Sequence, residues 1–258
     1  MGARVHRLAA IHPAHNLMKP LRLLSHFLTA SLAAFAASAQ APVTKKARVA
    51  TPNPAFAPVA DVAGLPRVLL LGDSISIGYT VPVRERLAGR ANVHRPPENC
   101  GDTARGVTSL DKWLGAGRWD VIHFNFGLHD LKYLDAKNAL ALPPAGKQVA
   151  SPEVYERNLR AIVGRLKQTG AKLIFATTTP VPAGADGRIE ADVARYNAVA
   201  ARVMKELGVA IDDLYAFVRP RQGDIQRPAN VHFTDAGSGQ LAEAVVASIL
   251  PLLPPASR

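Results

Sequence analysis

The sequence is short of cysteine, of long apolar runs and of clustered positive charge, and each shortage excludes something. Cys100 is the only cysteine among 258 residues, so no intrachain disulfide can form. No apolar run reaches the roughly 20 residues that a membrane-spanning helix needs. The formal net charge is +11, but the basic residues form no run of five or more. Charge therefore gives no reason to expect nucleic acid as a partner.

Cofactor and metal motifs are also missing. The strand-to-glycine turns carry neither G-x-G-x-x-G nor G-x-x-x-x-G-K-[ST], the spacings that cradle dinucleotides and phosphates. Around Cys100 there is no second cysteine and no metal-ligand spacing. We expect a protein that works without a cofactor and without a metal.

The first 39 residues differ from the rest because they contain no aspartate or glutamate. Basic residues precede a short apolar stretch that begins at Leu23 and ends in the small residues Ala37-Ser38-Ala39. These are the three parts of a secretory signal. We expect a signal peptide over residues 1–39, with Met1 or Met18 as the start. The mature protein would be periplasmic or secreted, with no stable insertion in a membrane.

Residues 40–65 alternate alanine, valine and proline, which predicts an extended linker rather than a packed element. From residue 66 to 258, apolar runs and helical patterns alternate, which predicts one α/β domain with a parallel sheet and helices on both faces. The predicted strands cover residues 68–71, 91–95, 120–127, 172–179 and 209–213. The predicted helices cover 82–87, 103–114, 151–169, 189–207 and 235–250. The long connection 131–150 is interpreted as a lip over the site.

One stretch stands out as a place for chemistry. The apolar run Val68–Leu71 reads as a buried strand that ends at Gly72, and Ser74 follows directly. Open α/β sheets bind their ligands at the carboxyl ends of the strands, so a serine there is placed as a nucleophile. The plain alternative is a strand end where Asp73 caps a turn. Ser76 is a rival, but its hydroxyl is expected to cap the next helix.

Three further loops meet Ser74 at the same predicted edge of the sheet, and they contain Gly101, His129 and His232. Acyl transfer is the chemistry that such a set can perform. Ser74 would attack a carbonyl while His232 takes its proton and later returns it to the leaving alcohol. The Ser74 and Gly101 N–H groups, with a side-chain donor from the third loop, would hold the oxyanion.

Four blocks carry a resemblance to a known family. They are Gly72-Asp-Ser-Ile75, Cys100-Gly-Asp-Thr103, Gly127-Leu-His-Asp130 and Val231-His-Phe-Thr234. Together they resemble the four ordered blocks of the SGNH (GDSL-type) hydrolases. The resemblance implies a flavodoxin-like three-layer α/β/α sandwich and metal-independent ester hydrolysis. It also implies Ser74 as nucleophile, Gly101 as a backbone oxyanion donor and His232 as base.

The sequence departs from that family at two positions. His129 stands where the family has an asparagine as side-chain oxyanion donor. A histidine with a proton on Nε2 can also donate, so we expect His129 to take the role, with Asn125 as the fallback.

Ala229 stands where the family has the aspartate that orients the catalytic histidine. Another acceptor must therefore orient His232. The alternatives are Asn230, Asp224, a backbone carbonyl, or Asp212 or Asp213. Asp224 is the preferred carboxylate, and a Ser–His dyad oriented by a backbone carbonyl is an equal alternative.

These observations predict an exported SGNH-type serine esterase acting on small acyl esters, with O-acetyl groups on carbohydrate as the favoured substrate. A binding or scaffold protein that has lost the chemistry, and an O-acyltransferase, stay open as alternatives. The acyl chain length and the oligomeric state are not predicted. Three other polar residues are expected to be structural: His123 in the core, Asp130 as a brace of its loop, and Cys100 as a buried filler.

Overall fold

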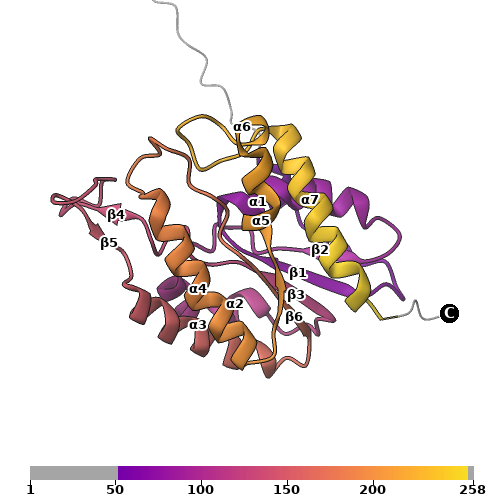
Figure 1. Cartoon of the computed structure of the whole chain (residues 1–258). Helices are drawn as coiled ribbons and strands as arrows, with labels where there is room; N and C mark the ends of the chain where they lie inside the picture. Colours follow the sequence, from indigo (N-terminus) through magenta and orange to yellow (C-terminus); the bar gives the residue numbers. More distant parts are fainter. Residues whose placement is uncertain (1–51, 255–258) are drawn as a thin grey trace, which may run out of the picture. The chain divides into compact units, whose positions relative to one another are not determined.

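A five-stranded sheet runs through residues 52–254, the part of the chain that the computed structural model describes (Figure 1). All neighbouring strands in it are parallel. Their order across the sheet is β2 (Asn92–His94), β1 (Arg67–Leu71), β3 (Val121–Phe124), β6 (Lys172–Ala176) and β7 (Ala210–Asp212). The predicted signal peptide, residues 1–39, lies outside the described residues.

The central strands are mostly apolar and buried because helices cover both of their faces. In β3 all four residues are buried, and in β1 only Arg67 is partly exposed. Leu69 of β1 pairs with Ile122 of β3 in this parallel register. Since every strand points the same way, the carboxyl ends of all five meet at one edge of the sheet.

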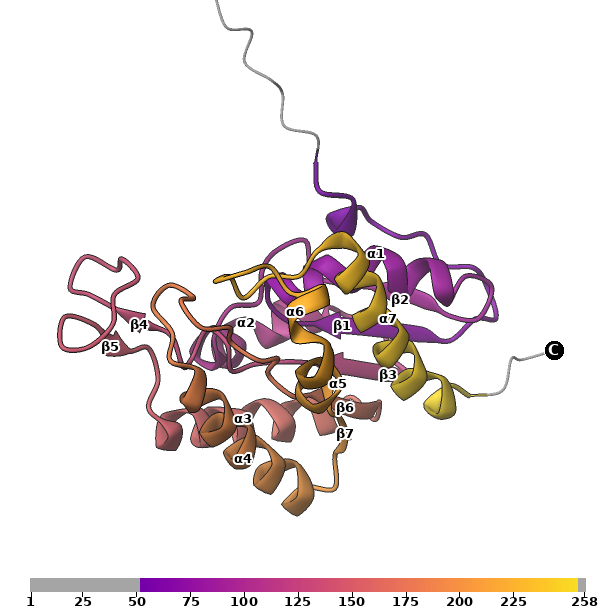
Figure 2. The ribbon, with the colours of Figure 1, turned by 45° about the horizontal axis from the view of Figure 1, so that its top comes forward.

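Helices form a layer on each side of the sheet (Figure 2). One layer holds α1 (Ser74–Arg86) and α7 (Asp235–Ile249), which pack on each other, with the short α5 (Leu214–Val218) and α6 (Gln222–Ile225) beside α7. The other layer holds α2 (Thr103–Leu114), α3 (Pro152–Lys167) and α4 (Glu190–Glu206). The predicted three-layer α/β/α sandwich with a parallel sheet is confirmed.

The predicted short helix over residues 82–87 is wrong in its start, because α1 begins at Ser74. Asp73 caps this helix: its Oδ1 accepts a hydrogen bond of 2.9 Å from the Ile75 N–H. Pro82 lies inside α1 instead of opening a helix. A proline there removes one intrahelical hydrogen bond, and packing of α1 on α7 compensates for that loss.

Residues 52–65, from the segment expected to be an unpacked linker, contact the domain. The 3₁₀ turn η1 (Pro54–Phe56) packs on α1, and its Pro54 carbonyl accepts a hydrogen bond of 3.2 Å from Arg84. Val62 makes two hydrogen bonds with the side chain of Asn92, through its N–H and its carbonyl. A proline-rich composition indicates an extended backbone, but it does not show whether side chains of the domain will bind that backbone.

The connection over residues 131–150 carries a small antiparallel hairpin of β4 (Tyr133–Leu134) and β5 (Lys147–Gln148), which projects from one end of the molecule in Figure 1. Asp192 of α4 accepts hydrogen bonds from the Tyr133 hydroxyl at 2.8 Å and from the Gln148 amide at 3.0 Å. The hairpin is thereby fastened to the start of α4. Within residues 52–254, every helix is too short or too polar to cross a membrane.

Candidate active site

Ser74 is the first residue of α1, directly after the turn that follows β1. Gly72 makes this sharp turn practicable, because a Cβ at that position would lie 2.8 Å from the Cβ of Ser76. The cap from Asp73 fixes the start of the helix. The Ser74 side chain is half-buried and stands at the carboxyl edge of the sheet, as predicted.

His232 reaches Ser74 from the loop between α6 and α7. Its Nε2 lies 2.9 Å from the Ser74 Oγ, across 158 residues of sequence. Two hydrogen bonds within the loop brace it. The backbone N–H of Arg227 donates to the His232 carbonyl at 2.9 Å, and the side-chain amide of Gln226 donates to the Val231 carbonyl at 2.9 Å. A histidine on such a braced loop is held in one orientation, as a base needs to be.

Asn230 determines which nitrogen of His232 carries the proton. Its Oδ1 accepts the His232 backbone N–H at 2.9 Å and lies 2.8 Å from the His232 Nδ1. Because a backbone N–H can only donate, the shared atom is the amide oxygen, and Nδ1 must also donate to it. The Nε2 lone pair then faces the Ser74 hydroxyl. This is the tautomer that a general base requires.

The preference for Asp224 as the orienting group is wrong. Asp224 lies in α6 and makes no hydrogen bond with His232. Asp212 accepts from His123 in the core at 2.9 Å, and Asp213 caps α5. Within residues 52–254, the ring nitrogen of His232 that faces away from Ser74 therefore bonds to an amide and not to a carboxylate.

Burial lowers the pKa of His232, and the positive charges of Arg227 and Arg188 lower it further, against the opposing effect of Asp73. The imidazole is consequently neutral at neutral pH. A neutral imidazole can accept the Ser74 proton, whereas an imidazolium cannot.

The loop of Gly101 lies beside the turn of Ser74, because the Cys100 N–H donates to the Gly72 carbonyl at 3.2 Å. Gly101 has φ of 67°, a conformation that suits glycine. Its N–H donates to the Asn99 Oδ1 at 2.9 Å, so this expected oxyanion donor is already occupied. The Ser74 N–H, in the first turn of α1, has no acceptor among the described residues.

His129 lies on the turn that follows β3, where the Asp130 and Leu131 N–H groups donate to the Gly127 carbonyl. The Lys132 ammonium lies 3.3 Å from the His129 Nδ1. An ammonium can only donate, so Nδ1 is the acceptor and the proton sits on Nε2. Burial lowers the pKa of His129, and Lys132 and Arg188 lower it further. His129 is thus neutral with an Nε2–H donor, the form expected for an oxyanion contact.

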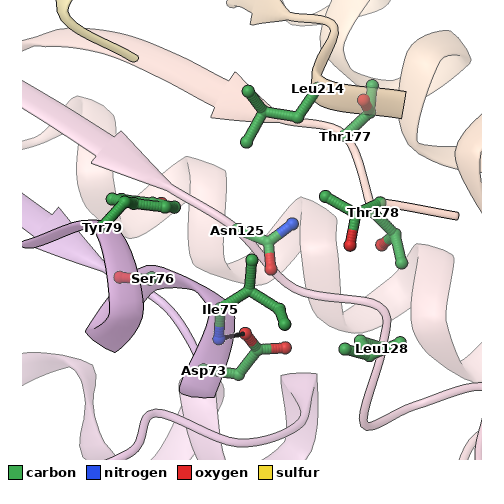
Figure 3. A pocket seen from close by; sticks show the side chains of 10 residues that line it. Asp73, Ile75, Ser76, Tyr79, Asn125, Leu128, Thr177, Thr178 and Leu214 are labelled. Atoms are coloured by element: carbon green, nitrogen blue, oxygen red, sulfur yellow. Dashed lines mark hydrogen bonds between the residues drawn. The ribbon is translucent and has the colours of Figure 1, made fainter. Parts of the chain in front are cut away.

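Other singled-out residues have structural partners. Asn125 points into a small cavity beneath the nucleophile turn (Figure 3), where its Nδ2 donates to the Ala176 carbonyl at 2.8 Å. Ser74 does not line that cavity, so Asn125 is a poor substitute donor. Ser76 does not cap a helix, because it lies inside α1 and accepts a hydrogen bond of 3.0 Å from Arg95.

Two predicted structural roles agree with the geometry. Asp130 accepts hydrogen bonds from the Thr103 N–H at 3.0 Å and from its hydroxyl at 2.5 Å, which joins the His129 turn to the start of α2. Burial raises the pKa of this carboxyl to about 6. Cys100 is fully buried, and burial raises the pKa of its thiol to about 11, which leaves it unreactive.

A groove of about 610 Å³ opens beside Ser74 and His232. The two sides differ: α1 contributes apolar residues such as Ile77 and Val81, and the loop before α7 contributes Arg227. The segment Asn53–Ala55 forms part of the wall. The volume is in the range of sites for small ligands. Within the described part of the chain, no group of three His, Cys, Asp or Glu side chains is arranged to hold a metal ion.

Lys132, Arg188 and Arg227 lie at this site and were not singled out in the sequence. Arg188 donates its Nε to the Leu128 carbonyl at 3.2 Å, next to His129. The available signal was weak. Lys132 stands three residues after His129, but no spacing rule connects Arg188 or Arg227 with the four blocks.

Comparison with known proteins agrees with this geometry. Residues 70–239 match the model of the GDSL-like Lipase/Acylhydrolase family. A lipase/acylhydrolase from Enterococcus faecalis is similar in structure, with a TM-score of 0.60, 19% identity, and coverage of 75% of this chain and 100% of that chain. Among curated proteins, no sequence matches this chain significantly.

Two acetyl xylan esterases have a similar fold. One, AlAXEase, has a TM-score of 0.58 and 15% identity, over 71% of this chain and 99% of that one. The other, from Geobacillus stearothermophilus, has a TM-score of 0.58 and 17% identity, over 71% of this chain and 94% of that one.

Proposed function

The chain belongs to the GDSL-like lipase/acylhydrolase family, and on this premise we propose that it is an exported serine esterase that removes small acyl groups, above all acetyl, from carbohydrate. The observation that carries the proposal is the hydrogen-bond chain from the Ser74 Oγ through His232 to the Asn230 Oδ1. It gives the serine a correctly protonated base.

The reaction proceeds in two halves. The Ser74 Oγ attacks the ester carbonyl as its proton moves to the His232 Nε2, which forms a tetrahedral oxyanion. Collapse breaks the bond to the alcohol, which takes the proton from Nε2, and leaves an acyl-serine. Water then attacks the acyl-serine as His232 takes the water's proton. Collapse returns that proton to Ser74 and releases the carboxylic acid.

The oxyanion needs donors that are already in place. The Ser74 N–H and the His129 Nε2–H are the two proposed donors. The Gly101 N–H becomes a third when the Asn99 side chain turns away from it. Each such donor is typically worth about 10²–10³ in rate.

A small acyl group on a saccharide is supported by two observations. The groove at Ser74 has the volume of a small-ligand site, which leaves room for a saccharide beside the serine. Two of the similar folds belong to proteins described as acetyl xylan esterases. Export is supported by the basic, apolar and small-residue segments of residues 1–39.

The test is turnover by the purified protein, with the Ser74→Ala variant as control. We expect hydrolysis of 4-nitrophenyl acetate faster than of the octanoate, and release of acetate from acetylated xylan. The variant should lose both activities. A wild-type rate equal to that of the variant on every ester would refute the esterase. For export, intact mass of protein from the culture medium or periplasm should place the mature start at Gln40.

Ala229 and His129, the two departures from the family pattern, are the features that would favour a binding protein without activity. Asn230 now supplies the orienting acceptor that Ala229 lacks, and His129 has a donor proton on Nε2. These two contacts favour the hydrolase. Product analysis with an added acceptor sugar distinguishes hydrolysis from acyl transfer, because a transferase would form a new sugar ester.

A further inference from the structure

Basic side chains from three loops surround the pair of Ser74 and His232. Lys132 is bonded to His129 at 3.3 Å, and Arg188 to the Leu128 carbonyl at 3.2 Å. Arg227 lines the groove together with Ser74 and His232, and its Nε donates to the Phe233 carbonyl at 3.1 Å. Each cation thus bonds to a loop of the site; Lys132 and Arg188 are half-buried, and Arg227 is exposed.

Arg188 and Arg227 lie on loops that touch each other. A Cβ built on Gly184 would lie 3.3 Å from the Cβ of Ala229. The Gln226 side chain also donates to the Pro180 carbonyl at 2.8 Å. Both guanidinium groups are close enough to His232 to lower its pKa. The two arginines therefore flank the catalytic histidine from neighbouring loops.

Asp73 and Asp186 act on the charge of Arg188, and Asp102 and Asp130 on that of Lys132, but within residues 52–254 these carboxylates form no ion pair with the two cations. Some arginines and lysines of residues 52–254 pair with acids, as Arg160 does with Glu156. Lys132, Arg188 and Arg227 form no ion pair with any described residue. Three nearby acids have other contacts or positions. Asp73 caps α1, and the backbone carbonyl of Asp186 accepts a hydrogen bond from Arg188. Asp235 begins α7 on the wall of the groove.

The guanidinium groups also retain donors. The Arg188 Nη2 and both Nη atoms of Arg227 have no acceptor among the described residues. Arginine binds carboxylate and sulfate through two parallel N–H donors, so these atoms suit such a group. Burial lowers the pKa of Arg188 and of Lys132, and a bound anion would offset that cost.

The oxyanion of the reaction does not account for Arg227, because the oxyanion forms at the acyl carbon bound to Ser74. Arg227 lies on the groove instead, where the rest of the substrate must extend. We propose that the alcohol part of the ester is an acidic saccharide, whose carboxylate or sulfate is bound by Arg188 and Arg227. Lys132 adds to the positive potential at the mouth of the site. This inference rests on the proposed function, because it names the alcohol that the esterase releases.

The experiment compares matched substrates. One is an O-acetylated oligogalacturonide with free carboxylates, and its partner is the same compound with the carboxyls methyl-esterified. A sulfated acetyl-oligosaccharide and its desulfated form make the second pair. We expect kcat/KM to favour the anionic member of at least one pair by about tenfold. The pair that shows the preference distinguishes carboxylate from sulfate. Added salt should reduce the preference.

The variants locate the effect. Arg188→Gln and Arg227→Gln should each lower the anionic-to-neutral ratio of kcat/KM about three-fold, and the double variant should bring it close to one. Arg157→Gln removes one positive charge from α3, and the ratio should stay as in the wild type. A wild-type ratio of one or less in both pairs overturns the proposal. A double variant in which kcat/KM for the anionic and for the neutral substrate falls by the same factor also overturns it.

Binding to the Ser74→Ala variant gives a second readout that needs no turnover. Calorimetric titration with the unacetylated anionic and neutral oligosaccharides should show tighter binding of an anionic one, lost in the Arg188→Gln/Arg227→Gln background. If the protein cleaves no ester but binds the acidic saccharide selectively, the proposed function fails and the anion site stands. If it cleaves esters without any preference for the anion, the reverse holds.

Discussion

Serine, histidine and a third polar residue come together twice in this protein, once at the surface and once in the core. At the surface His232 lies between Ser74 and Asn230. In the core Asp212 lies between His123 and Ser248, with its Oδ2 2.9 Å from the His123 Nε2 and 3.3 Å from the Ser248 Oγ.

The core group contains a carboxylate, but its serine does not contact the histidine and its histidine is closed to substrate. His123 is fully buried in β3, and its partner Ser248 bonds the carboxylate and not the imidazole. At the surface the acceptor is an amide, but histidine stands in the middle and the serine opens to a groove. The order of the hydrogen bonds and the access of substrate therefore determine the site, and residue type alone does not.

Replacement of His232 should cause the strongest loss of activity. His232→Ala should lower kcat/KM for 4-nitrophenyl acetate about 10⁴-fold, because the serine loses its base. The midpoint of unfolding should hardly change, since His232 is exposed. His94→Gln, a half-buried histidine bonded to Asp61, is the control and should keep full activity. Equal losses in the two variants would contradict the assignment.

Substitutions in the core pair, His123 and Asp212, should change the stability of the protein and not its activity. His123→Leu leaves the buried Asp212 carboxylate without its main partner, and we expect a loss of about 3 kcal/mol in the free energy of unfolding. Urea denaturation measures this loss. The folded fraction should keep its kcat. The double variant His123→Leu/Asp212→Leu should recover much of the stability, because it buries no unpaired charge. A single variant as stable as the wild type would disprove the structural role.

Asn230 is the next test, because it distinguishes orientation from simple proximity. Asn230→Ala should lower kcat about 10²-fold by releasing the His232 ring. Asn230→Asp should retain an acceptor in the same place and recover activity at higher pH. A carboxylate there favours the imidazolium, so the pKa of His232 rises and the acid limb of kcat/KM moves upward. If Asn230→Ala turned over like the wild type, a backbone carbonyl would be the orienting group.

The smallest effect is on pH dependence. Activity requires neutral His232, so kcat/KM should fall as pH decreases through its pKa, which burial holds below the usual 6.5. Arg227→Gln removes a charge that lowers this pKa and should move the acid limb upward by a fraction of a pH unit. A pH profile of the wild type and this variant measures the shift. A downward shift would show that Arg227 does not face the histidine.

Much of the fold was readable because its signals are local. The apolar run Val68–Leu71 and the glycine turns predict strands and the edge of the sheet where the loops meet. The start of α1 was missed because Pro82 looks like the first residue of a helix. Sequence pattern cannot weigh one lost hydrogen bond against the packing of α1 on α7.

At the site, the placement of Ser74 near His232 was predictable, whereas Asn230 was only one of several alternatives for the orienting group. Ala229 has φ of 49°, a left-handed conformation that alanine rarely adopts, and in this turn the Asn230 amide meets the ring two residues later. The residue types at these positions do not predict that turn. The preference for Asp224 came from chemistry alone, without the path of the chain.

In the proposed mechanism Ser74 is activated although an amide, that of Asn230, and not a carboxylate orients its base. Labelling of the mature protein with a fluorophosphonate probe, read by intact mass and peptide mapping, tests it most directly. We expect a single adduct, on Ser74, that is lost in His232→Ala and kept in His123→Leu under conditions where that variant is folded. No adduct on the folded wild-type protein, or an adduct on another serine, would contradict it.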